Sequence, residues 1–312
     1  MMQTLLGANG TIATELAKEL KLRFTSDIRL VSRTPQKVNE TDQLLAADLL
    51  DADQTDAAVN GSDIVYFTVG LPINGALWEA QFPRMMQNVI AACKRHHAKL
   101  VLFDNTYMYP VQKEPLTEQT PFAPAGQKAK ARATMTSLVL EAINTQQLEA
   151  VICRAPEFYG TQQTPGFTNS LIINRILNGQ TPKVLINDQT LRTLIWAPDA
   201  SKATALIGNT PEAYQQTWHL PCDDNRLTTQ AFIALFGKLY HKSLEYKILT
   251  ESELTLQSAE KPQIKELLEL LPRYKYDYLF DSSKFKQAFP DFRTTTYEEG
   301  IRQIIADATK IK

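Results

Sequence analysis

A turn near the start of the chain has the residue types that a phosphate group requires. It follows the apolar run 4–6 and reads Gly7-Ala8-Asn9-Gly10-Thr11-Ile12-Ala13. Gly7 permits a tight turn, Gly10 leaves the backbone open to a phosphate, and small Ala13 lets a helix pack close to the strand. Amides of the first helical turn would then face the pyrophosphate of a dinucleotide. We predict a dinucleotide site in preference to an ordinary strand-to-helix turn. The binding residues expected here are Gly7, Asn9, Gly10, Thr11 and Ile12.

The next expected strand, residues 28–31, ends in Ser32-Arg33-Thr34. A free ribose 2′-hydroxyl is usually held at this position by Asp or Glu, whereas a 2′-phosphate requires a cation and a small hydroxyl. Ser32 and Arg33 supply those two groups. We therefore predict NADP(H) as the preferred cofactor and NAD(H) as the second candidate. The alternative is that Arg33 is a solvated surface charge.

Both turns belong to a repeated pattern of short apolar runs and amphipathic segments. The runs cover residues 4–6, 28–31, 64–67, 100–103 and 150–152. Continuous apolar character indicates strands that are covered on both faces, as in a parallel sheet. Between them, apolar residues recur at helical spacing, and Pro83 is expected to open one helix as a first-turn residue. The predicted fold is therefore α/β, with a doubly wound parallel Rossmann sheet.

After residue 152 the spacing becomes irregular, because Pro and Gly residues break the chain into short elements. We expect a Rossmann domain over residues 1–155 and a smaller substrate-binding lobe that starts at about residue 156. Two helix starts are expected in this second part. Asp199 is placed to cap a helix, and Thr296-x-x-Glu299 has the spacing of a capping box.

The composition narrows the classes of partner. The formal net charge is −1, so no basic surface is expected to attract nucleic acid or an anionic membrane, and a small-molecule substrate fits better. Cys93, Cys153 and Cys222 are far apart, which indicates thiols in a reducing compartment. No run approaches the roughly 20 apolar residues of a membrane span, and a strand expected from residue 4 leaves no room for a signal peptide. We therefore expect a cytoplasmic protein, with a homodimer as one option.

Several motifs of other enzyme classes are absent from the sequence. It contains no H-E-x-x-H, C-x-x-C, G-x-S-x-G or G-K-[ST] pattern, which disfavours zinc hydrolases, serine esterases and P-loop NTPases. His96 and His97 are expected at a helix end, and His219 and His241 stand alone in the sequence. No metal site is predicted.

With these residues together, the chain resembles an extended or atypical short-chain dehydrogenase/reductase of the NAD-dependent epimerase/dehydratase type over nearly all of its length. Gly7-x-x-Gly10-x-x-Ala13 is similar to the G-x-x-G-x-x-G turn of that family, with Ala in place of the last Gly. Two further pairs resemble its cofactor motifs. They are Asp48-Leu49, in the position of the acidic motif that follows the third strand and lies beside the adenine, and Val69-Gly70, in the position of the small pair near the cofactor.

The resemblance continues into the second part of the chain. Residues 154–160 are similar to the signature R-x-x-x-x-Y-G, at which the chain leaves the sheet for the substrate lobe. Asp199 and residues 281–284 also resemble elements of the family. Because the second lobe of the family is interleaved, part of the range from about 190 to 225 in the lobe 156–312 is expected to return to the sheet. Residues 217–220 resemble such a strand.

The acid that this family uses is missing. Its catalytic Tyr is followed four residues later by a Lys and assisted by a Ser or Thr. Between Tyr109 and Tyr159 the sequence has no tyrosine. If Met108-Tyr109-Pro110 matches the family's V-Y-G, the Ser/Thr, Tyr and Lys positions hold Asn105, Lys128 and Arg132.

Lys128 and Arg132 lie four residues apart, so they share one helix face and suit an anion or the cofactor's ribose and phosphates. A lysine acts as an acid near neutral pH only if its pKa falls, through burial or a neighbouring cation such as Arg132. The alternative is that both residues belong to an exposed basic helix start.

Tyr107 is our best replacement for the missing acid, because it follows the strand 100–103 at the edge where ligands of such sheets bind. Alternation places Asn105, Tyr107 and Tyr109 on one side if the extended conformation persists. The alternative for Tyr107 is simple packing of an amphipathic ring. The residues expected to line the substrate site are Tyr109, Phe158 and Tyr159.

Two functions remain open at this point. The first is an NAD(P)-dependent oxidoreductase or epimerase-like enzyme that acts on a small carbonyl or sugar-nucleotide substrate. The second is an NADP(H)-binding sensor or regulatory protein that has lost the catalytic Tyr. A methyltransferase that uses the same sheet is a weaker third alternative.

Overall fold

The computed structural model of the chain describes residues 1–161 and 164–310. Its centre is a seven-stranded, entirely parallel sheet in the order β11-β6-β5-β4-β1-β2-β3. The strands are β1 (Gln3–Leu6), β2 (Ile28–Ser32), β3 (Gln43–Ala46), β4 (Ile64–Phe67), β5 (Lys99–Asp104), β6 (Ala150–Arg154) and β11 (Gln216–His219). Every apolar run that the sequence indicated forms one of these strands, which confirms the predicted α/β fold.

β3 was not among the apolar runs, although it contains Leu44, Leu45 and Ala46; most of its side chains are exposed at the edge of the sheet. The strand at the opposite edge, β11, contains most of the segment 217–220 that the family resemblance implied. β11 pairs with β6, so this late segment of the chain forms one edge of the sheet.

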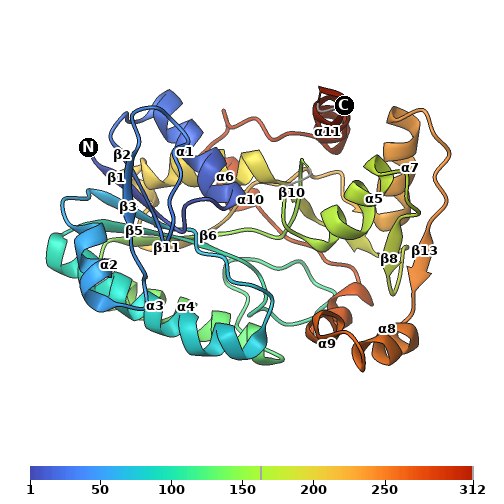
Figure 1. Cartoon of the computed structure of the whole chain (residues 1–312), viewed down its shortest axis with the longest axis horizontal. Helices are drawn as coiled ribbons and strands as arrows, with labels where there is room; N and C mark the ends of the chain where they lie inside the picture. The colour runs from blue at the N-terminus through green and yellow to red at the C-terminus, as the bar shows by residue number, and fades with distance from the viewer. Residues whose placement is uncertain (162–163, 311–312) are drawn as a thin grey trace. The chain divides into compact units, whose positions relative to one another are not determined.

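Helices cover both faces of this sheet (Figure 1). They are α1 (Thr11–Arg23), α2 (Ala52–Val59), α3 (Gly75–His96), α4 (Gln127–Asn144) and α6 (Ala197–Gly208). α2, α3 and α4 lie on one face, and α1 and α6 lie on the other. A single apolar cluster joins α2, α3 and α4 to the sheet, so the carboxyl ends of the strands are held on a rigid support.

The expected role of Pro83 was wrong. α3 begins eight residues earlier, at Gly75, where the side chain of Asn74 accepts a hydrogen bond from the Leu77 amide at 2.9 Å. Pro83 lies inside the helix. A proline in a helix interior costs about 3 kcal/mol. Burial of Trp78 and Phe82 on the same helix offsets this, because each large apolar side chain contributes about 1.5–3 kcal/mol.

The chain divides into two compact units, each composed of several segments. The first contains Met1–Tyr109, Pro121–Ala155 and Ala200–Leu220. The second contains Pro110–Thr120, Pro156–Asp199 and Pro221–Lys312. The segment 110–120 in the second unit was not anticipated from the sequence. Asp199 was expected to cap a helix. It lies instead in the first turn of α6, because this helix begins two residues before it.

The second unit is built from short elements. Its strands pair as β7 (Glu157–Tyr159) with β10 (Leu194–Trp196), β9 (Leu191–Arg192) with β12 (Leu227–Thr228), and β8 (Lys183–Leu185) with β13 (Lys247–Leu249). Its helical segments are η1 (Thr168–Ile173), α5 (Asn174–Leu177), α7 (Thr229–Leu239), α8 (Glu251–Ser258), α9 (Pro262–Leu268), η3 (Leu271–Tyr274), α10 (Ser283–Ala288) and α11 (Tyr297–Lys310). The capping box predicted for α11 is confirmed, because Thr296 and Glu299 exchange backbone-to-side-chain hydrogen bonds at 3.0 and 3.2 Å.

In the part of the chain that the structure describes, no helix has the length and apolar character needed to cross a membrane.

Candidate functional site

Gly7 makes the turn after β1 possible. Its φ angle is +95°, and a Cβ at this position would lie 2.8 Å from the backbone N and Cα of Val69. No other residue type fits such a contact against backbone without displacing it. The close approach also places Val69, one of the predicted cofactor residues, directly against the turn.

Gly10 differs from Gly7 because nothing in the protein requires it. Its φ angle is −74°, which any residue adopts, and the nearest atom to a Cβ would be the Gly7 carbonyl oxygen at 3.6 Å. It is the N-cap residue of α1 and has no side chain to cap the helix. A phosphate oxygen would satisfy the role that a capping side chain has in other helices. The arrangement therefore fits a dinucleotide's pyrophosphate beside Gly10, Thr11 and Ile12.

Asn9 connects the turn to the loop that follows β2. Its φ angle is +81°, its Nδ2 donates to the Thr34 carbonyl at 2.8 Å, and its Oδ1 accepts from the Gln36 amide at 3.0 Å. Just before these contacts, the chain has half-buried Ser32, the last residue of β2, and exposed Arg33. Asn9 thus holds in place the loop on which the 2′-phosphate determinants were predicted.

The other predicted cofactor residues lie in loops of the same unit, near the ends of β3 and β4. Asp48 is half-buried, and its carboxylate accepts from the Leu50 amide at 3.0 Å. Leu49 is buried, and its carbonyl accepts from Asn88 Nδ2 at 2.8 Å. Gly70 is exposed, and no atom lies within 4 Å of a Cβ placed there. Gly70 therefore leaves open space beside Val69.

Three polar residues occupy one row across the carboxyl ends of β5, β6 and β11. Asp104 is aligned with Arg154, and Arg154 is aligned with His219. All three are buried. The Asp104 carboxylate accepts from Thr136 Oγ1 at 2.6 Å and lies 3.7 Å from Arg154 Nη2. Sequence reasoning treated His219 as isolated, which was wrong: its Nε2 is 2.8 Å from the Tyr109 hydroxyl.

Tyr109 and Tyr107 do not share one side, because the chain turns directly after β5. The Tyr109 amide donates to the Thr106 carbonyl at 3.1 Å, so the extended conformation that alternation requires ends here. Tyr109 is fully buried, and its hydroxyl accepts a hydrogen bond from Arg154 in addition to its contact with His219. Its hydroxyl is therefore engaged within the first unit.

Arg132 and Lys128 are not on an exposed basic helix start, because both are buried. Arg132 Nη1 is 3.5 Å from Asp104 Oδ1, and its guanidinium lies over the rings of Phe82 and Trp78 at 4.2 and 5.3 Å. Burial lowers the pKa of this guanidinium, whereas the neighbouring Asp104 and Tyr107 act to raise it. Arg132 is thus a cation held inside the first unit, close to Tyr107.

Asn105 and Tyr107 stay half-buried, in contrast to Tyr109. Asn105 Oδ1 accepts from the Tyr107 amide at 2.9 Å, which fixes the start of the turn. The Tyr107 ring packs parallel to that of Trp78, with centroids 6.0 Å apart and an angle of 10° between the planes. Of the catalytic candidates, these two therefore retain exposed surface, which a group that contacts a substrate requires.

The substrate candidates Phe158 and Tyr159 lie on β7 in the second unit. Tyr159 is a core residue, packed against Trp196, Phe232 and Tyr297, and burial raises the pKa of its phenol well above the usual range. Phe158 is half-buried. Tyr159 thus has the surroundings of a structural residue, whereas Phe158 keeps some exposed surface.

A pocket next to β7 was missed by sequence reasoning. We call it the Glu157 pocket; its volume is about 470 Å³ when the space at its mouth is included, and its lining includes Glu157, Thr168, Lys183, Arg192, Phe232 and Tyr274. These residues come from segments far apart in the sequence, so no local pattern could have brought them together. The one sequence signal was Glu157, which lies inside the signature 154–160.

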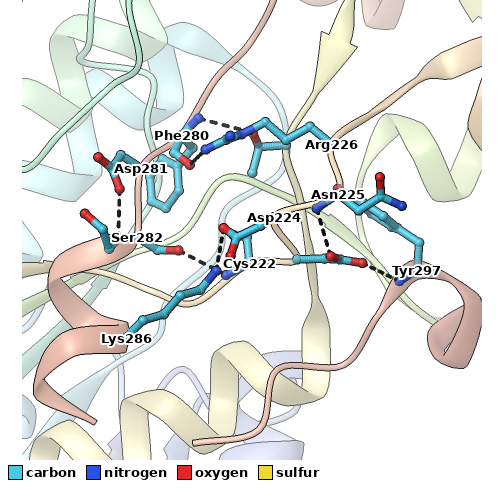
Figure 2. Close-up of polar contacts among 12 residues, drawn as sticks. Cys222, Asp224, Asn225, Arg226, Phe280, Asp281, Ser282, Lys286 and Tyr297 are labelled. Carbon is cyan, nitrogen blue, oxygen red and sulfur yellow. Dashed lines mark hydrogen bonds and ion pairs between the residues drawn. The ribbon is translucent and has the colours of Figure 1, made fainter. Parts of the chain in front are cut away.

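A polar network lies next to Tyr297, one of the residues that line this pocket (Figure 2). Arg226 Nη2 donates to the Phe280 carbonyl at 3.1 Å, and the amides of Asn225 and Tyr297 both donate to the Asp223 carboxylate at 2.9 Å. The bond to Asp223 holds the backbone of Tyr297 at the start of α11, where Tyr297 lines the Glu157 pocket.

Among residues 1–161 and 164–310, no group of three or more His, Cys, Asp or Glu side chains is placed to hold a metal ion.

Comparison with known proteins places this arrangement in a family. A dTDP-glucose 4,6-dehydratase of Streptomyces niveus is 26% identical over 222 residues, which cover 68% of this chain and 65% of the dehydratase. The chain thus matches just under two thirds of that relative's length. Among solved structures, UDP-glucuronic acid 4-epimerase of Bacillus cereus in complex with NAD has a TM-score of 0.78 at 16% identity, covering 100% of this chain and 99% of the epimerase. A dTDP-glucose 4,6-dehydratase of Streptomyces venezuelae with NAD bound has a TM-score of 0.79 at 13% identity, covering 99% of this chain and 97% of the dehydratase.

The two structural likenesses show the shared fold, and the family follows from the sequence match. The sequence model of the NAD dependent epimerase/dehydratase family matches residues 4–220, well over half of the chain. This chain therefore belongs to the NAD dependent epimerase/dehydratase family.

Proposed function

We propose that this protein is an NAD(P)-dependent oxidoreductase or epimerase-like enzyme. The observation that carries the proposal is the contrast between Gly7, which the fold requires, and Gly10, which it does not. A residue without a side chain at the open N-terminus of α1 is explained by a phosphate group that must approach the backbone. When bound, the nicotinamide would supply or accept a hydride.

We propose NADP(H) as the preferred cofactor. The two solved relatives named above were determined with NAD. In this chain, however, β2 ends at Ser32, the loop after it begins with Arg33, and Asn9 fixes that loop to the turn. A guanidinium and a hydroxyl favour a 2′-phosphate, whereas a carboxylate would favour a free 2′-hydroxyl.

We propose that Tyr107 takes the place of the missing acid. Its Oη would donate a proton to the substrate oxygen, and Asn105 holds the turn that carries it. The guanidinium of Arg132 is close enough for the two groups to interact electrostatically. A nearby positive charge stabilises a tyrosinate, so Arg132 would act as the positioning cation. Lys128, buried on the same helix, remains a second candidate for the acid.

The substrate that we propose is a small carbonyl compound or a sugar nucleotide. The relatives in the comparisons are named for dTDP-glucose and UDP-glucuronic acid. The second unit, with Phe158 at its half-buried surface and the Glu157 pocket beside it, is our candidate for the substrate-binding lobe.

Calorimetric titration with NADP⁺ and NAD⁺ tests the cofactor site. We expect binding of both, with NADP⁺ about ten-fold tighter, a difference of about 1.4 kcal/mol. Gly10→Glu should abolish both, because its carboxylate would occupy the position of the phosphate. The matched control is Leu22→Glu, which adds the same charge at a 78% exposed position on α1 and should bind normally. Normal binding by well-folded Gly10→Glu would refute the site.

Oxidation of NADPH across a panel of carbonyl compounds separates an enzyme from a sensor. We expect turnover with at least one compound, and loss of most of it in Tyr107→Phe. The variant Lys128→Ala shows whether the buried lysine contributes to the rate. Tight NADPH binding with no oxidation on any compound would favour the regulatory function, since the usual Tyr is absent.

A further inference from the structure

We infer that Glu157 neutralises Arg192 in the Glu157 pocket, so that this pocket takes an uncharged part of a substrate and selects against a diphosphate. The inference narrows the substrate class and so rests on the proposed function. It identifies Glu157 as a specificity-determining residue, although Glu157 takes no part in hydride or proton transfer.

The pocket is largely apolar. Around its charged groups lie the rings of Phe167, Phe232, Tyr274 and Tyr297, and several aliphatic side chains. Among the described residues that line it, the charged ones are Glu157, Lys183 and Arg192. A pocket of this kind buries a ring or another apolar group and orients it through a few polar contacts.

Arg192 is the side chain in this pocket that would ordinarily indicate an anionic ligand. Its side chain is only 8% exposed, and its Nη2 lies 3.5 Å from Glu157 Oε2. Its Nη1 donates to the Arg273 carbonyl at 2.6 Å. The rings of Tyr274 and Tyr278 lie 4.3 and 4.9 Å from the guanidinium carbon. Both the charge and the faces of the guanidinium are therefore already engaged.

Glu157 is held as firmly as Arg192. Its Oε1 accepts hydrogen bonds from the amide and hydroxyl of Thr168 at 2.9 and 2.7 Å. Its Oε2 accepts from the Tyr274 hydroxyl at 3.1 Å. Its side chain is 14% exposed, so little solvent screens the carboxylate from Arg192 or from a ligand. The carboxylate cannot turn away from the pocket without losing these bonds.

The charge balance decides which ligand the pocket prefers. A diphosphate carries roughly two or more negative charges and is usually bound by several cations. With Arg192 paired to Glu157, the remaining cation among the described residues of the wall is Lys183, a single positive charge that would face the two or more negative charges of a diphosphate. A diphosphate in the pocket would also approach the fixed carboxylate of Glu157, which repels it. An uncharged group needs no cations and is not repelled by the Glu157 carboxylate.

Thymidine and thymidine 5′-diphosphate form a matched pair of probes, because they differ only in the diphosphate. Each is titrated by calorimetry into the whole protein with NADP⁺ and NAD⁺ in excess, so that the dinucleotide site is filled. For the wild type we expect thymidine to bind at least as tightly as the diphosphate. In Glu157→Gln, Arg192 becomes available, and the diphosphate should then bind at least about ten-fold tighter than thymidine.

Three control variants separate the alternatives. Arg192→Met in the Glu157→Gln background should remove the gain, and Lys183→Gln should leave the wild-type preference unchanged. Glu157→Asp keeps the charge and should retain the wild-type preference even if the variant is less stable. Folding is checked by thermal denaturation, and the wild-type and Glu157→Asp measurements test the inference if Glu157→Gln does not fold.

Two results would overturn the inference. One is a wild-type protein that binds the diphosphate ten-fold or more tighter than thymidine. The other is a folded Glu157→Gln protein that gains no affinity for the diphosphate, including the case in which neither probe binds. Failure of the proposed function is seen separately, as absence of NADP⁺ and NAD⁺ binding, because the cofactor turn and the Glu157 pocket share no residues.

Discussion

Polar groups at the carboxyl ends of the strands differ between the two sides of the parallel sheet. Around β1 and β2, Gly10 has free space beside it and Arg33 is exposed, so the backbone and the guanidinium are open to a ligand. At the ends of β5, β6 and β11, Asp104, Arg154 and His219 are buried and contact one another or shared neighbours. We propose that the first region binds the cofactor, whereas the buried contacts of the second make it rigid. In our proposal, the chemistry falls to Asn105 and Tyr107, the half-buried residues next to the second region.

Tyr107→Phe gives the largest expected effect and tests whether Tyr107 is the general acid. Loss of a general acid typically costs about 10²–10⁴-fold in rate, so the turnover of NADPH with an accepted carbonyl should fall by that factor. NADPH affinity should remain unchanged. Tyr276→Phe, at a tyrosine that is 48% exposed in the second unit, is the control and should turn over normally. A rate that survives Tyr107→Phe would assign the proton to another group.

Asp104→Asn tests the rigidity of the buried region. Asp104 is the carboxylate that both Arg132 and Arg154 approach, at 3.5 and 3.7 Å. Removing one partner of a buried ion pair leaves charge uncompensated and costs about 3–5 kcal/mol, so the free energy of unfolding in urea should fall by that amount. Asp56→Asn, which removes a surface partner of Arg95, should change it far less. Equal effects would show that burial of the Asp104 group is unimportant.

The pair Gly7→Ala and Gly10→Ala sharpens the contrast within the binding region. Gly7→Ala forces a side chain into a left-handed backbone and against Val69, so it should lower the free energy of unfolding by about 1–3 kcal/mol. Gly10→Ala has no such contact and should leave stability nearly unchanged while it weakens NADP⁺ binding. Thermal denaturation and calorimetry on the same samples separate the two effects. The comparison fails if both variants lose stability equally.

Arg33→Ser has the smallest expected effect. An exposed guanidinium contributes a screened, charge-assisted contact to a 2′-phosphate, so NADP⁺ affinity should fall about ten-fold, or about 1.4 kcal/mol. NAD⁺ affinity should not change. Raising the salt concentration should reduce the wild-type preference for NADP⁺ and have little effect on the variant. An equal loss for both nucleotides would mean that Arg33 does not distinguish them.

The fold and the glycine turn were accessible from the sequence because they depend on local patterns. A run of apolar residues covered on both faces and a Gly-x-x-Gly turn between strand and helix are each contained in about ten residues. β3 was implied only by the family resemblance, through the position of Asp48-Leu49, and its largely exposed side chains distinguish it from the buried strands. Pro83 was misplaced because burial of the surrounding helix face outweighed the usual position of proline.

The arrangement of the residues at the ends of β5, β6 and β11 could not be predicted from local sequence patterns. The row of Asp104, Arg154 and His219 depends on the register of three strands that lie far apart in the sequence. Tyr107 and Tyr109 separated because one hydrogen bond, to Thr106, ended the strand geometry. The Glu157 pocket combines residues from opposite ends of the second unit, so only the folded chain reveals it.

The route of the chain between its units limits how it can be recombined with its relatives. The backbone passes from one unit to the other after Tyr109, Thr120, Ala155, Asp199 and Leu220. A fragment cut after residue 155 would keep β6 but lose β11, which pairs with its outer edge in the intact protein. The unpaired edge of β6 would then promote association with other chains. Grafting the second unit, our proposed substrate-binding lobe, would have to move three separate stretches at once, so we expect divergence in this fold to proceed by point substitution.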